Sequence, residues 1–74
     1  MITAENLAAI EKEVQGYFPD AKVKNSTGAN GINLAFTKQS LNASDVMDLA
    51  TISTKHMLSL NVKRSGTGLS VHFN

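Results

Sequence analysis

Two stretches of the chain place cations and hydroxyl groups beside glycine-rich turns. The first reads KVKNSTGANGINLAF over residues 22–36, and the second reads NVKRSGTGLSVHF over residues 61–73. Lysine and arginine side chains contact phosphate or carboxylate groups, and turns of this composition can point backbone N–H groups at an anion. The candidates for contact with a partner or with phosphate are therefore Lys22, Lys24, Lys63, Arg64 and His72.

Neither stretch is a nucleotide-binding P-loop. That motif needs a Gly-Lys-Ser or Gly-Lys-Thr that leads directly into a helix, whereas an expected strand follows both turns here. Hairpin turns, for which glycine and asparagine are the usual residues, explain both stretches more simply. Anion binding at the turns is the weaker of the two interpretations.

The residues that could support catalysis or bind a metal are sparse. The chain has no cysteine, which excludes disulfides and thiolate–metal sites. His56 and His72 have no carboxylate at the spacing of metal ligands. Asp45 and Asp48 fall in the first turn of an expected helix, where carboxylates offset unpaired N–H groups. No serine lies in the context of a nucleophile elbow. The sequence predicts no enzyme activity, no metal and no cofactor.

The elements that position these residues begin with a helix. Thr3 can cap its N-terminus, and Ile2 and Leu7 stand at the two positions of a hydrophobic staple. Pro19 ends it, because the residue before a proline is biased away from helical backbone angles. Its predicted inward residues follow helical spacing: Leu7, Ile10, Val14, Tyr17 and Phe18.

A hairpin should follow this helix. Residues 21–24 form a short predicted strand with Val23 inward, and residues 25–31 have the composition of a turn. In the next predicted strand, Ile32, Leu34 and Phe36 alternate with small or polar residues, which indicates a half-buried strand.

The second half of the chain repeats the plan. Asn42 is the expected cap of a helix that runs to about Met57, and Leu41 with Val46 forms the staple. The predicted inward residues of this helix are Val46, Leu49, Ala50, Ser53 and Met57. A strand with Leu58, Leu60 and Val62 inward, a turn at residues 65–68, and a strand with Leu69, Val71 and Phe73 inward complete the chain.

The order αββαββ predicts one α+β domain over residues 1–74, a two-layer sandwich with two helices on one face of a four-stranded antiparallel sheet. This is the layout of a ferredoxin-like fold or of its circular permutation, with the strand order left open. Residues 2–26 align with 41–65 and residues 29–37 with 66–74, leaving Thr27 and Gly28 unmatched; six pairs are identical, among them Lys24 with Lys63. Duplication of a unit (about 2–38 and 41–74) and coincidence of patterning both explain this.

The uncovered face of this sheet should be polar and mildly basic. If the apolar residues of each strand face the helices, the other face carries Lys22, Lys24, Asn33, Ala35, Thr37, Ser59, Asn61, Lys63, Ser70 and His72. It has no aromatic residue, which disfavours binding of nucleic acid by base stacking. Phosphate contact by the cations remains open, and solvated lysines are the simplest interpretation.

Composition and charge exclude other classes. Apolar residues make up 42% and charged residues 18% of the chain, which excludes wholesale disorder. Net charge is +1, but residues 1–20 carry −3 and residues 21–74 carry +4. No basic segment precedes a long apolar run, and no apolar run approaches the roughly 20 residues of a membrane span. The expectation is a cytoplasmic protein that does not enter membranes.

The favoured hypothesis is a small non-enzymatic binding protein, of the inhibitor, adaptor or regulatory kind, that docks onto a protein partner. The sheet edges could pair with a partner strand or a second copy, giving a homo-oligomer. Tyr17, Met47 and Met57 could add contacts at the rim of the helical layer. The alternative is a nucleic-acid-binding protein that contacts phosphates through the basic hairpins. A third hypothesis, small-anion binding at the turns, has the least support.

Overall fold

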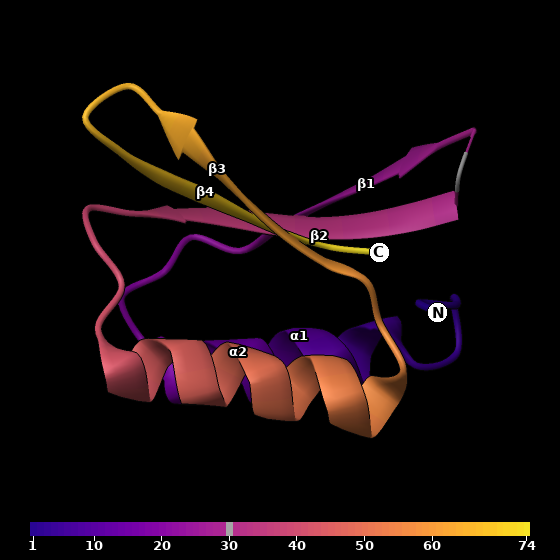
Figure 1. Cartoon of the computed structure of the whole chain (residues 1–74). Helices are drawn as coiled ribbons and strands as arrows, with labels where there is room; N and C mark the ends of the chain where they lie inside the picture. Colours follow the sequence, from indigo (N-terminus) through magenta and orange to yellow (C-terminus); the bar gives the residue numbers. More distant parts are fainter. Residues whose placement is uncertain (30) are drawn as a thin grey trace.

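The computed structural model describes residues 1–29 and 31–74. Its elements are α1 (Leu7–Tyr17), β1 (Lys24–Gly28), β2 (Gly31–Lys38), α2 (Ala43–His56), β3 (Leu60–Ser65) and β4 (Gly68–Phe73). Figure 1 shows the two helices side by side beneath one face of the sheet. The predicted α+β fold with the order αββαββ is confirmed.

The sheet has the order β1-β2-β4-β3, with every neighbouring pair antiparallel. Each αββ unit therefore contributes one edge strand and one central strand, and the two central strands pair across the units. Moving β4 in front of α1 would give the order βαββαβ of the ferredoxin-like motif, so the element order is that of a circular permutation. The sequence alone did not specify this strand order.

The first hairpin differs from its prediction. β1 covers Lys24–Gly28, whereas the sequence placed a strand at residues 21–24 and a turn at residues 25–31. Asn25 and Ser26 favour turns, yet they pair with Leu34 and Asn33 of β2. Pairing with a long central strand outweighs the weak local preference of these residues. Asn30, which belonged to the predicted turn, lies outside the described residues.

The pairing also changes how the two units correspond. Gly28 closes the first hairpin opposite Gly31, and Ser65 closes the second opposite Gly68. With the hairpins superposed on these closing pairs, Lys24 corresponds to Asn61 and not to Lys63. The two residues of the first unit that have no counterpart in the second therefore precede β1. Lys24 and Lys63 are the same residue type but do not occupy equivalent positions in the two units.

The predicted cap at Asn42 is confirmed, whereas α1 begins at Leu7 with Asn6 as its N-cap, and the side chain of Asn6 makes no capping bond to the helix. Asn42 Oδ1 accepts from Asp45 N at 2.8 Å, and Asp45 Oδ2 accepts from Asn42 N at 3.1 Å, which makes a capping box. Thr3 and Asn6 make the same exchange in the turn that leads into α1, with distances of 2.7 and 3.3 Å. These bonds satisfy N–H groups that have no partner inside a helix.

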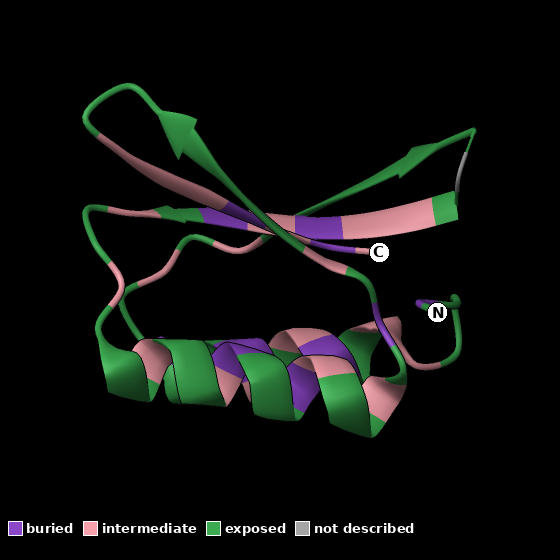
Figure 2. Ribbon diagram, viewed as in Figure 1, coloured by how far each residue is buried: buried purple, intermediate pink, exposed green. Residues whose placement is uncertain are grey.

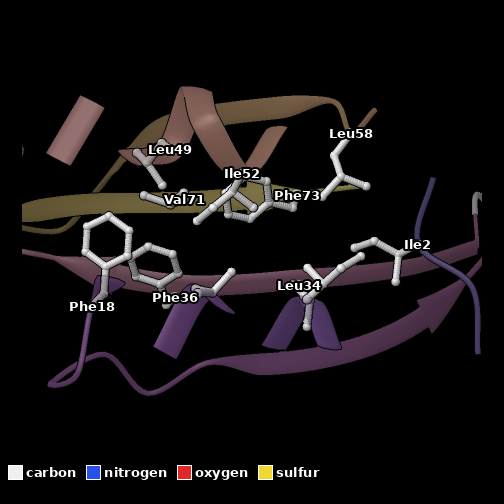
Figure 3. Packing of buried hydrophobic residues seen from close by; sticks show 11 residues of the cluster. Ile2, Phe18, Leu34, Phe36, Leu49, Ile52, Leu58, Val71 and Phe73 are labelled. Carbon is white, nitrogen blue, oxygen red and sulfur yellow. The ribbon is translucent and has the colours of Figure 1, made fainter. Parts of the chain in front are cut away.

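The core lies between the helices and the sheet. Figure 2 shows burial concentrated there, and Figure 3 shows the side chains that fill it, with the rings of Phe18 and Phe36 5.1 Å apart. The buried apolar residues are Ile2, Ile10, Val14, Phe18, Leu34, Phe36, Leu49, Ile52, Leu58, Val71 and Phe73. The predicted inward positions of α1, β2 and β4 are largely confirmed, with Tyr17 exposed instead.

The predicted core face of α2 was partly wrong. Leu49 and Ile52 are buried, whereas Val46 is 51% and Met57 85% exposed. The buried stripe is rotated by about one residue from the predicted one, a turn of about 100° about the helix axis. Within the described part of the chain, neither helix is long and apolar enough to cross a bilayer.

Candidate interface on the open face of the sheet

The register of the sheet places three of the five candidate residues, Lys24, Lys63 and His72, on the face away from the helices. Lys24 pairs with Ala35, and Ala35 pairs with His72. Paired residues in an antiparallel sheet point to the same face, and neighbours along a strand point to opposite faces. Since Val71 and Phe73 are buried against the helices, His72 and its partners face outward.

A second row of the same face contains Lys63. Lys63 pairs with Ser70, and Ser70 pairs with Thr37. Lys22 precedes β1 and reaches this neighbourhood, because it lines an open hollow of about 200 Å³ together with Lys24, Thr37 and Ser70. The open face therefore brings together Lys22, Lys24, Lys63 and His72, as predicted.

Arg64 does not belong to this group. It pairs with Leu69, which lies on the helix-facing side of β4, so Arg64 is on the side opposite to Lys63. It is exposed, and Figure 1 shows that the β3–β4 hairpin curves away from the helices. The sequence listed Arg64 as a candidate contact but not on the open face, and the register likewise places Lys63 and Arg64 on opposite faces, because adjacent residues of a strand alternate.

The polar groups of the open face are organised by local hydrogen bonds. Ser70 Oγ and His72 Nε2 are 2.9 Å apart, as expected for residues two apart on one strand. Asn74 Nδ2 donates to Asn33 Oδ1 at 2.6 Å across β4 and β2. These bonds orient side chains on a face that has hydroxyl and amide groups between its cations.

Positively and negatively charged side chains are separated between the two layers of the fold more completely than they are between the two ends of the sequence. The strands and residues 21–23 contain five cations and no carboxylate side chain: Lys22, Lys24, Lys38, Lys63 and Arg64. The helices and their flanking turns contain all six carboxylate side chains and two lysines: Glu5, Glu11, Glu13, Asp20, Asp45, Asp48, Lys12 and Lys55. One layer is thus basic and the other acidic.

Lys38 is the one strand cation of these five with a described acidic partner. Its Nζ lies 3.6 Å from Asp45 Oδ2 and 5.2 Å from the centre of the Phe18 ring. Lys38 pairs with Leu69, so it lies on the helix-facing side. No ion pair within the described residues involves the lysines of the open face.

A cluster between the helices was not predicted. Glu13 on α1 contacts Lys55 Nζ at 2.6 Å and His56 Nε2 at 2.7 Å on α2. The hydrogen bond from Lys55 lowers the pKa of Glu13, against the opposing effect of burial, with His56 contributing in the same direction as Lys55. The same pairing raises the pKa of Lys55. This neighbour of His56 could not be predicted from the sequence, because it is the packing of the two helices that brings together residues 43 positions apart.

The arrangement offers little that would bind a metal. No group of three or more histidine, cysteine, aspartate or glutamate side chains in the described residues could hold a metal ion.

The chain has four aromatic residues, and none is on the open face: Phe36 and Phe73 are buried under it, and Tyr17 and Phe18 belong to the end of α1. The open face is thus suited to hydrogen bonds and to attraction of negative charge.

Comparison of the chain with models of protein families, with curated proteins and with solved structures found no match.

Proposed function

We propose that this chain is a small non-enzymatic binding protein that docks onto an acidic protein partner with the open face of its sheet. The observation that carries the proposal is the set of four basic side chains on that face, Lys22, Lys24, Lys63 and His72, on strands without a carboxylate. A face of one charge sign attracts a partner of the opposite sign and speeds its association.

The rest of the face supports a protein partner. Its amide and hydroxyl side chains can donate and accept hydrogen bonds, which suits the mixed polar surface of a protein. It has no aromatic platform on which bases could stack. The acidic outer layer of the helices would repel the same partner, so docking would be restricted to one side of the molecule.

Binding of nucleic acid through its phosphates is the second candidate. The absence of carboxylates from the strands favours it, because three lysines on one face could each contact a phosphate. Such binding would be independent of sequence and steeply dependent on salt. The two candidates therefore differ in a quantity that can be measured.

Fluorescence anisotropy separates the two candidates. The probes are a labelled polyglutamate peptide and labelled single- and double-stranded DNA and RNA, each titrated at low and at physiological salt. The variants are Lys24→Glu and Lys63→Glu on the open face, with Lys12→Glu on α1 as the matched control.

The proposal predicts that the acidic peptide binds and that each open-face variant weakens its Kd by about tenfold, an effect of the size expected when one close contact is reversed in a partly screened setting. Lys12→Glu should leave the Kd within about twofold. Binding of nucleic acid alone, with a steep salt slope, would favour the second candidate. Equal loss in all three variants would remove the open face as the site.

A further inference from the structure

The two edges of the sheet, β1 and β3, differ in what they offer to a partner. Figure 2 shows β3 exposed along most of its length, at the edge of the sheet. An edge strand presents backbone N–H and C=O groups to which another extended chain can bind. At the β3 edge, the backbone groups, the exposed side chains and the charge are all suited to binding an extended chain.

The backbone groups at the free edge of β3 can be assigned. Ser59 and Asn74 exchange both backbone hydrogen bonds, at 2.9 and 3.0 Å. In an antiparallel pair, hydrogen-bonded and non-hydrogen-bonded residue pairs alternate. Leu60, Val62 and Arg64 therefore turn their N–H and C=O groups away from β4, toward the free edge.

The side chains of these same residues point to the helix-facing side. Val62 pairs with the buried Val71 and remains 44% exposed, so it offers apolar surface beside the free backbone groups. On β1 the corresponding positions are polar: Asn25 donates to Glu11 Oε1 at 3.4 Å, and Thr27 is an exposed hydroxyl residue. Among the described residues of the two edge strands, β3 has an exposed apolar side chain beside its free backbone groups, whereas β1 does not.

Charge indicates what would bind there. Lys63 and Arg64 put one cation on each face of β3, and the neighbouring strand has no carboxylate. A second copy of β3 would bring the same two cations to the edge, and like charges near each other across strands destabilise the pairing. An acidic strand would neutralise them instead.

We propose that β3 binds an extended acidic segment of the partner as an additional strand of the sheet. Run antiparallel to β3, this segment has carboxylates opposite Arg64 and Lys63 and apolar side chains opposite Val62 and Leu60. The inference rests on the proposed docking to an acidic protein and names the element of that partner which would be recognised.

The test uses amide hydrogen exchange of the whole chain, measured by NMR. The probe is a synthetic peptide whose centre reads Glu-Asp-Val-Thr-Val, and its control has lysine at both acidic positions. At free peptide about nine times Kd, exchange at Leu60, Val62 and Arg64 should slow about tenfold, because only the unbound fraction exchanges.

Two variants keep the test specific. Val62→Glu places a carboxylate opposite the apolar side chain of the peptide and should weaken Kd at least about tenfold. Thr27→Glu makes the matched change on the helix-facing side of the other edge and should leave Kd unchanged. Both positions are exposed, so both variants should fold, and the thermal midpoint verifies this.

Three other outcomes would contradict strand addition at β3, and each indicates a different mode of binding. Slowed exchange at Asn25 and Thr27 would make β1 the docking edge. A doubled mass without peptide, with β3 protected, would make a second copy the occupant. Failure of the peptide to bind, while polyglutamate still binds the open face, would refute strand addition and leave the proposed function intact.

Discussion

Gly68, the first residue of β4, lies close to the backbone at the end of β2. A methyl group at its Cα would lie 2.6 Å from the backbone oxygen of Lys38 and 3.4 Å from Cα of Gln39. Backbone atoms cannot rotate aside as the end of a flexible side chain can, so the strand itself would have to shift. A glycine is therefore required here by close approach, and its backbone angles are ordinary for any residue.

Gly68→Ala should lower the free energy of unfolding by about 1–3 kcal/mol, the range seen when a packed site is overfilled. Gly28→Ala is the matched control, because nothing lies within 4 Å of the added methyl group. It should change stability by less than about 0.5 kcal/mol. Urea unfolding of both variants measures the difference, and equal effects at the two sites would contradict the close approach.

Single residues also mark how far the site could be predicted from the sequence. Alternation along each strand predicted that Lys24, Lys63 and His72 share the open face, because a period of two follows from strand geometry alone. The same alternation leaves Arg64 out of the predicted open face, in agreement with the register. Which of these cations contacts a partner cannot be inferred from alternation, because alternation gives only the face of the sheet.

At the scale of elements, Glu13 connects the two helices through Lys55 and His56. The hydrogen bond from Lys55 keeps the pKa of Glu13 below its ordinary value of 4.5. A carboxylate with a lowered pKa in the folded state stabilises the protein above its unfolded pKa. That contribution is lost as pH falls through the folded pKa.

Glu13→Gln should therefore be less stable than the parent chain at about pH 6, and the difference should shrink as pH falls below about 4. The measurement is the free energy of unfolding against pH for both proteins. Glu5→Gln, in the turn before α1, makes the same chemical change away from the cluster. Parallel curves for Glu13→Gln and the parent chain would show that the ion pair does not contribute.

Elements also show why part of the fold could not be predicted. Helix caps, hairpin turns and strand alternation are local, and the sequence predicted most of them. The bounds of β1 and the buried stripe of α2 depend on the neighbours that an element meets. Pairing with β2 makes residues 24–28 a strand, and packing against the sheet turns Ile52 inward while Val46 stays exposed. Neither effect can be inferred from one segment alone.

At the scale of the molecule, the fold converts a weak charge gradient along the chain into two oppositely charged layers. The acidic side chains all lie in the helices and their flanking turns, and five of the seven cations lie on or just before the strands. A net charge of +1 conceals this arrangement. The separation of basic and acidic side chains into two layers, rather than the net charge, is the basis for expecting an acidic partner.

The most direct test of docking on the open face is a map of amide chemical shifts on the isotope-labelled chain during titration with polyglutamate. If the acidic ligand docks there, the shifts that saturate should concentrate at Lys24, Ala35, Lys63, Ser70 and His72, and the outward faces of α1 and α2 should be unaffected. Shifts concentrated on the helices, or scattered without saturation, would contradict the open sheet face as the docking surface.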